Sequence, residues 1–199
     1  MTTTVWIVIA IAVLIAIGLV TYLAVGRGRT QRLRSRFGPE YDRTVEATGD
    51  QRGAERELNA RQERRRTFDI RELEPAVQSR YAEQWRAAQA RFVDEPAQAL
   101  RDADGMVTEI MSKRGYPMEN FEQMAADVSV DHAREVEDYR AAHAISEAST
   151  RDEASTEDMR LGIQHYRSLF ESLLGQETSN PANGAAAGIN DPKNESIAR

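Results

Sequence analysis

The sequence predicts an all-α protein with an N-terminal transmembrane helix, followed by a soluble bundle or irregular array of about five to seven helices. A long uncharged apolar run near the N-terminus indicates the membrane span. Apolar side chains at helical spacings, and the lack of any long alternating pattern, favour helices over strands in the rest of the chain. The predicted segments are a short tip (1–4), the span (5–25), a basic stem (26–38), a helical domain (39–175) and a disordered tail (176–199).

The predicted span reads VWIVIAIAVLIAIGLVTYLAV and carries no charged side chain. As a helix rising 1.5 Å per residue it would be about 31 Å long, close to the thickness of the hydrocarbon core. Trp6 and Tyr22 lie near its two ends, where aromatic rings favour the headgroup region. A cleaved signal peptide and a buried core helix are alternatives. However, residues 1–4 carry no basic side chain and the run exceeds a typical signal sequence, so an uncleaved span is preferred.

The stem determines the expected orientation. Basic side chains gather on the cytoplasmic side of membrane helices, and here they follow only the C-terminal end of the span. We therefore expect the N-terminus outside and the body in the cytoplasm, with the stem touching anionic headgroups at about 1 kcal/mol per arginine. The stem arginines are Arg27, Arg29, Arg32, Arg34 and Arg36.

The spacing of Ala12 and Ala16 would allow two spans to pack closely, so a homo-oligomer is an alternative. In so alanine-rich a segment, the spacing also arises easily by chance.

The charge of the helical domain argues against a nucleic-acid-binding protein. Residues 37–175 carry 19 basic and 29 acidic side chains, whereas a nucleic-acid footprint is a basic face. The absence of cysteine excludes disulfides and thiolate catalysis.

Two helices are expected first in the domain. Pro39 suits the first turn of a helix that ends at Gly49, and Asp50 can cap the next one. This second helix, ending near Arg66, is charged nearly all round, so we expect a solvated or coiled-coil-like arm. Its closing arginines, 64–66, are interpreted as a solvated helix end rather than a ligand site.

The apolar side chains of a linker are expected to pack against the bundle. Pro75 is then expected to begin a third helix with one continuous apolar stripe. The linker residues are Phe68, Ile70 and Leu73, and the stripe contains Val77, Tyr81, Trp85, Ala88 and Phe92. Tyr81, Trp85 and Phe92 are also candidates for a partner surface, together with the charged helix at about 50–66.

Four more helices are expected further along. One runs from Pro96 to a stop at Gly115, and a short one covers about 119–126. Asp131 would cap the next, 148–154 would form a loop, and Ser155 with Asp158 resembles a capping box before the last helix.

The chemistry-bearing residues do not form a recognisable catalytic or cofactor motif. An aromatic-Arg-small pattern recurs, and its Arg140 and Arg167 could pair with acids of neighbouring helices. The three histidines share no metal-ligand spacing, although His143 and His165 with Glu147 could meet in space. We therefore predict no enzyme, no cofactor and no metal; a helical-bundle enzyme or metal binder stays a minor alternative.

Several stretches together resemble an uncharacterised family of small single-pass bacterial membrane proteins from GC-rich genomes, whose members carry labels such as hypothetical or secreted. The stretches are RFGPEYDRTV, RYAEQWRAAQARFVDEP, VTEIMSKRGYP, FEQMAADVSVDH and STEDMRLGIQHYRSLFESLL. The resemblance covers most of residues 32–174 and implies no activity, cofactor or site. A secreted location would contradict the topology expected from the stem.

The functional expectation is a tether or scaffold that recruits a protein partner to the cytoplasmic face of the bacterial inner membrane. The alternative is the same architecture facing outward, as an envelope-associated structural protein.

Overall fold

The structure, a computed structural model, describes residues 6, 28 and 30–175, and it is all-α over these residues. Residues 30–37 are helical and lead directly into the first of the bounded helices. These are α2 (Pro39–Thr48), α3 (Gln51–Arg66), α4 (Pro75–Arg91), α5 (Pro96–Arg114), α6 (Phe121–Val128), α7 (Val136–Thr150) and α8 (Thr156–Leu173).

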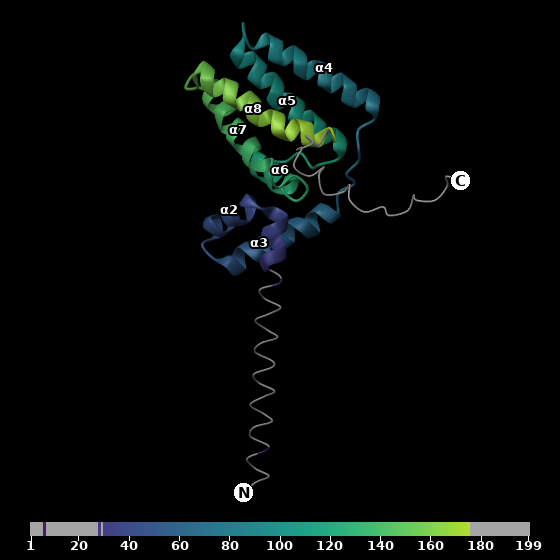
Figure 1. The fold of residues 1–199 in the computed structure, drawn as a ribbon, viewed down its shortest axis with the longest axis vertical. Helices are drawn as coiled ribbons and strands as arrows, with labels where there is room; N and C mark the ends of the chain where they lie inside the picture. Colours follow the sequence, from purple (N-terminus) through teal and green to yellow (C-terminus); the bar gives the residue numbers. More distant parts are fainter. Residues whose placement is uncertain (1–5, 7–27, 29, 176–199) are drawn as a thin grey trace, which may run out of the picture.

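Helices α4 to α8 form a bundle around one large apolar core, with α8 lying between α4 and α7 in Figure 1. The rings of Trp85 on α4 and Phe170 on α8 stack with their centroids 4.3 Å apart. Tyr139 and Tyr166 meet edge to face in the same core. Burial of these aromatic side chains supplies much of the apolar area that stabilises a bundle of this size.

The stripe on α4 belongs to this core. Tyr81 is fully buried and Trp85 is 5% exposed, while Phe92 is half-buried. The structure therefore leaves little of this predicted partner surface accessible, because α4 turns its aromatic face towards the bundle. The linker residues Phe68 and Ile70 pack against the same core, as the sequence predicts.

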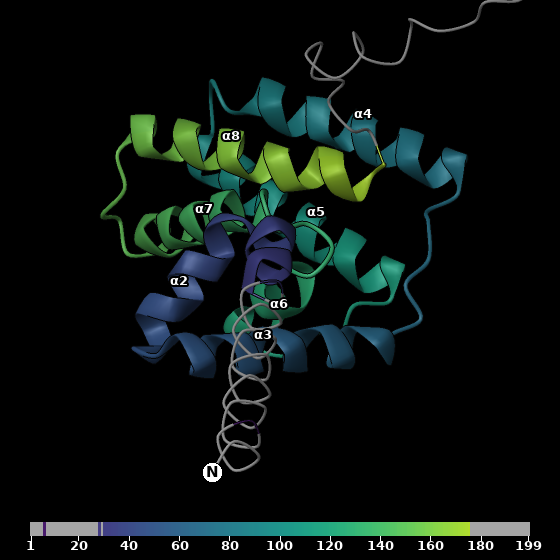
Figure 2. The ribbon, with the colours of Figure 1, turned by 60° about the horizontal axis from the view of Figure 1, so that its bottom comes forward.

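A second, smaller core holds residues 30–37, α2 and α3 together, and we call residues 30–66 the N-terminal unit. Its apolar side chains are Leu33, Phe37, Tyr41 and Leu58, and the bundle contributes Val130 from the turn after α6. Figure 2 shows α3 running beneath the bundle, with α2 beside it. Leu58 is fully buried and α3 packs on α2 and α6, so the prediction of a solvated arm is wrong.

The helix boundaries follow local signals in most places. Pro39, Pro75 and Pro96 each open a helix, and Gly49 and Gly115 end one in the left-handed conformation. Ser155 and Asp158 form the predicted capping box.

Two expectations about α7 are wrong. Its N-cap is Glu135 rather than Asp131, since Asp131 is held instead by Arg65 and Tyr116. The helix also continues to Thr150, through part of the predicted loop at 148–154.

No helix among the described residues is both long and apolar enough to cross a bilayer. The predicted span at 5–25 lies outside the described residues apart from Trp6, and so does the predicted tail at 176–199.

Candidate interaction site

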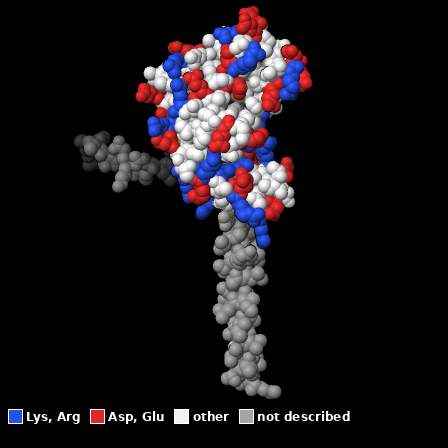
Figure 3. All heavy atoms as spheres, turned by 180° about the vertical axis from the view of Figure 1, so that it is seen from behind, with Lys and Arg blue, Asp and Glu red and all other residues white. Residues whose placement is uncertain are grey.

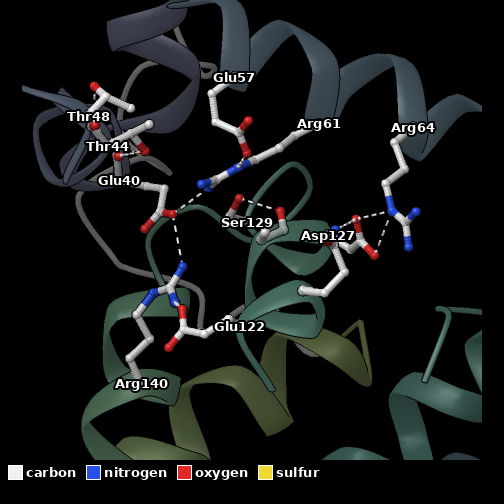
Figure 4. A network of polar contacts seen from close by, with 12 residues as sticks. Glu40, Thr44, Thr48, Glu57, Arg61, Arg64, Glu122, Asp127, Ser129 and Arg140 are labelled. Atoms are coloured by element: carbon white, nitrogen blue, oxygen red, sulfur yellow. Dashed lines mark hydrogen bonds and ion pairs between the residues drawn. The ribbon is translucent and has the colours of Figure 1, made fainter. Parts of the chain in front are cut away.

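The N-terminal unit meets the bundle through arginine–carboxylate pairs centred on Glu40, which α2 places almost wholly out of solvent (Figure 4). Glu40 Oε1 accepts hydrogen bonds from Arg61 on α3 at 2.6 Å and from Arg140 on α7 at 3.0 Å. Arg140 also donates to Glu122 on α6 at 2.9 Å. Two guanidinium groups compensate the buried carboxylate, as a charge removed from water requires.

A second set of arginine–carboxylate ion pairs links the C-terminal end of α3 to the bundle. Arg64 donates to Asp127 on α6 at 3.0 Å and to Glu119 at 2.6 Å. Asp127 is 1% exposed, so Arg64 satisfies a charge that the bundle has buried. Arg65 pairs with Asp131, which also accepts a hydrogen bond from Tyr116 at 2.8 Å.

A surface concavity of about 700 Å³ lies beside the Glu40 cluster, between α2, the start of α6, and α7. Its wall mixes both signs of charge with one aromatic platform, in which the rings of Phe121 and His143 stack 3.6 Å apart. The lining residues are Arg43, Asn120, Phe121, Glu122, Glu137, Arg140, Ala141, His143, Ala144 and Glu147.

Buried polar atoms without a hydrogen-bond partner gather around this concavity. They are Glu40 Oε2, Glu137 Oε1, Arg140 Nε and His143 Nδ1. Leaving such an atom unsatisfied costs about 1–3 kcal/mol, so native structures keep few of them, and a cluster calls for a functional or structural reason.

Glu137 links the concavity to the Glu40 cluster. Arg43 Nε lies 3.9 Å from Glu137 Oε1, which is near enough for ionic attraction but too far for a hydrogen bond. Burial, together with the neighbouring Glu40 carboxyl, raises the pKa of Glu137. The raised pKa favours the protonated form of the Glu137 carboxyl group over its charged form.

The concavity offers side-chain groups of several chemical kinds to a binding partner. A wall with arginine, carboxylate, amide and aromatic groups matches a polar, charged partner surface. Within the part of the chain that the structure describes, no group of three or more His, Asp or Glu side chains is placed to hold a metal ion. The two histidines considered for a shared metal site make separate contacts: His143 lies 3.7 Å from Glu147 on its own helix, whereas His165 hydrogen-bonds Asp138 at 2.8 Å.

The predicted lipid-contacting residues are only partly described. Trp6 is 70% exposed, and Arg32, Arg34 and Arg36 are exposed on the helix at 30–37. Arg34 pairs with Asp42 at 2.7 Å. Arg27, Arg29 and Tyr22 lie outside the described residues.

Sequence reasoning found part of the Glu40 cluster. The predicted pairing of Arg140 with acids of neighbouring helices is confirmed by its contacts with Glu122 and Glu40. Arg167 instead pairs with Glu171 one turn along its own helix. Glu40 lies in the first turn of α2, where any acidic side chain complements the helix dipole, and no local signal distinguishes it from the exposed acids around it.

No protein-family model, curated protein or solved structure matches the chain.

Proposed function

We propose that the protein is a single-pass membrane protein whose helical body binds a protein partner at the cytoplasmic face. The observation that carries this proposal is the burial of the apolar side chains of the helix at 30–37, which lies within the predicted basic stem. Leu33 is 3% exposed and Phe37 is fully buried in the N-terminal unit. An apolar run that leads almost directly into a folded unit would hold the body against the bilayer surface, without a long flexible linker.

The charge of the two parts supports the inward orientation. Residues 30–66 carry ten arginines and seven acidic residues, whereas residues 67–175 carry 12 basic and 22 acidic residues. The basic part follows the predicted span and the acidic part comes after it. Anionic lipids of a cytoplasmic leaflet attract the first and repel the second.

The concavity between α2, α6 and α7 is the surface that we assign to the partner. Ala144 is exposed on its wall, next to the stacked Phe121 and His143. Since the wall carries both signs of charge, a partner with complementary charges would bind with orientation as well as affinity.

Topology is tested first, and the cysteine-free chain allows single-cysteine labelling. A membrane-impermeant maleimide should label Thr3→Cys in intact cells, and Ala90→Cys on α4 only after permeabilisation. Labelling in the reverse pattern would place the body outside and favour the envelope-associated alternative. Release of the full chain by alkaline washing would overturn the membrane anchor itself.

The partner surface is tested by a photo-crosslinking residue at position 144 of the full chain in cells, with position 90 as the matched exposed control. We expect a discrete adduct at 144 that the change Glu147→Arg on the same wall removes. Equal adducts at both positions, or none at 144, would contradict the assignment.

A further inference from the structure

The N-terminal unit has an excess of free positive charge that its fold does not use. Among the described residues, the side chains of Arg32, Arg36, Arg52 and Arg56 make no ion pair or hydrogen bond, and all four are exposed. The remaining six arginines of the unit contact carboxylates of the unit or of the bundle, namely Arg34, Arg43, Arg61, Arg64, Arg65 and Arg66.

The carboxylates of the unit, in contrast, are nearly all occupied. Asp42 pairs with Arg34, Asp50 accepts from the first backbone amides of α3, and Glu57 pairs with Arg61. Glu55 accepts from Thr30, Gln51 and Tyr41. Glu40 and Glu63 also hold arginines, which leaves Glu46 as the only acid without a partner among the described residues of the unit.

Two of the free arginines lie on the part of α3 that touches the start of the helical stem. Gln51 donates to Thr30 at 3.3 Å, and Thr30 donates to Glu55 at 2.6 Å. Arg52 and Arg56 directly follow these two contact residues along α3. They are four residues apart and therefore share one face of the helix. Figure 3 shows basic side chains projecting from the lower end of the body.

Thr30 is only five residues beyond the predicted span. Five residues reach at most about 18 Å when fully extended, and about 8 Å as a helix. The shorter distance is close to the Debye length at physiological ionic strength. Salt would therefore only partly screen the electrostatic attraction between basic side chains near Thr30 and an anionic membrane surface.

We infer that Arg52 and Arg56 form, with Arg32, a second membrane-contact surface that docks the folded body on anionic lipid headgroups. This inference rests on the membrane anchor proposed above and adds that the body is held against the bilayer at a second place. The occupant is an anionic bilayer, because these arginines pair with no carboxylate of the body. Arg52 and Arg56 also directly follow the two α3 residues that contact Thr30, which is five residues beyond the predicted span.

The test uses the full chain in lipid nanodiscs, with a fluorophore on Ala60→Cys. Ala60 is exposed on α3, one turn beyond Arg56 on the same face. We expect a headgroup-attached quencher to quench the fluorophore in discs with about 30% phosphatidylglycerol, and much less in phosphatidylcholine alone. Each arginine should shift the docking equilibrium about five-fold, so Arg52→Gln with Arg56→Gln should shift it about 25-fold.

The matched control is Arg86→Gln with Arg134→Gln, which removes two exposed arginines from the bundle. This control should leave the quenching unchanged, and circular dichroism of both double variants should match that of the unchanged chain. If the chain enters the discs but quenching ignores lipid charge or responds equally to both pairs, the second contact is refuted and the anchor stands. If the chain does not enter the discs, the anchor and the second contact both fail.

Discussion

Glu40 joins the N-terminal unit to the bundle because its carboxylate binds arginines from both. Its side chain is 1% exposed, and its partners Arg61 and Arg140 are 14% and 9% exposed. Removing one partner from a buried ionic cluster leaves the remaining charges uncompensated. The cluster is therefore a point at which a single substitution should be costly.

We expect Glu40→Gln to lower the free energy of unfolding by about 3 kcal/mol, measured by urea denaturation. The control is Glu57→Gln, which removes the other acid bound to Arg61 but lies at a 49% exposed position. Its expected cost is below about 0.5 kcal/mol. Equal costs for the two variants would show that burial of the Glu40 cluster contributes nothing.

His132 should make stability depend on pH. It is buried, and Nδ1 lies 2.7 Å from Ser172 Oγ. Burial, with the nearby positive charge of Arg114 and Arg65, lowers the pKa of His132 to about 4, although Asp131 opposes this shift. The unfolded chain binds a proton on this histidine near pH 6.5, whereas the folded chain does so only near pH 4, so its contribution to stability is lost as the pH falls between these values.

Thermal or urea unfolding from about pH 7 to about pH 4 measures this effect, which amounts to at most about 3 kcal/mol. The comparison is between the unchanged chain and His132→Gln, since carboxylates also titrate in this range. The loss of stability at low pH should be smaller in the variant. An identical pH profile for the two proteins would refute the assignment.

Helix α8 packs closely against α5 and α7 because Gly162 has no side chain. A Cβ atom at this position would lie 2.9 Å from Leu100 Cδ1 and 3.2 Å from Ile145 Cγ2. Gly105 on α5 is also inside a helix, but a Cβ atom there would meet open space. The same substitution should therefore have opposite effects at the two positions.

We expect Gly105→Ala to raise the free energy of unfolding by about 1 kcal/mol, because alanine favours a helix more than glycine does. Gly162→Ala gains the same helix preference but must displace two packed side chains, and should lower stability by about 1 kcal/mol in total. Thermal unfolding of both variants measures the difference. A stabilising Gly162→Ala would show that α8 packs more loosely than the structure indicates.

The N-terminal unit and the bundle differ in the size of the apolar core that each contains. The large core lies entirely within residues 67–175, whereas the small core also contains Val130 of the bundle. A fragment of residues 67–175 should therefore unfold cooperatively, but with lower stability than the full chain, because Asp127 loses Arg64. A peptide of residues 30–66 should be largely unfolded alone, since few buried side chains support it. Circular dichroism melting of the two fragments tests both expectations, and a non-cooperative 67–175 fragment would contradict the first.

Local signals in the sequence predicted most of the helices and their ends. Prolines at helix starts, glycines in the left-handed conformation at their ends and the Ser155 capping box act within one or two turns, so a sequence reveals them. The start of α7 was missed because Asp131 has the side chain of a cap but is used by Arg65, whose position only the fold decides.

The composition and order of the residues determined an all-α body with an acidic balance, and predicted an apolar span with a basic stem. Tertiary structure alone decided that α3 packs under the bundle and that Tyr81 and Trp85 face inward. It also decided that, among many similar charged residues, Glu40, Arg61 and Arg140 form the buried ionic cluster. The physical reason is that a charged side chain's cost or benefit depends on its burial and its partner, and both are set by residues far away in the chain.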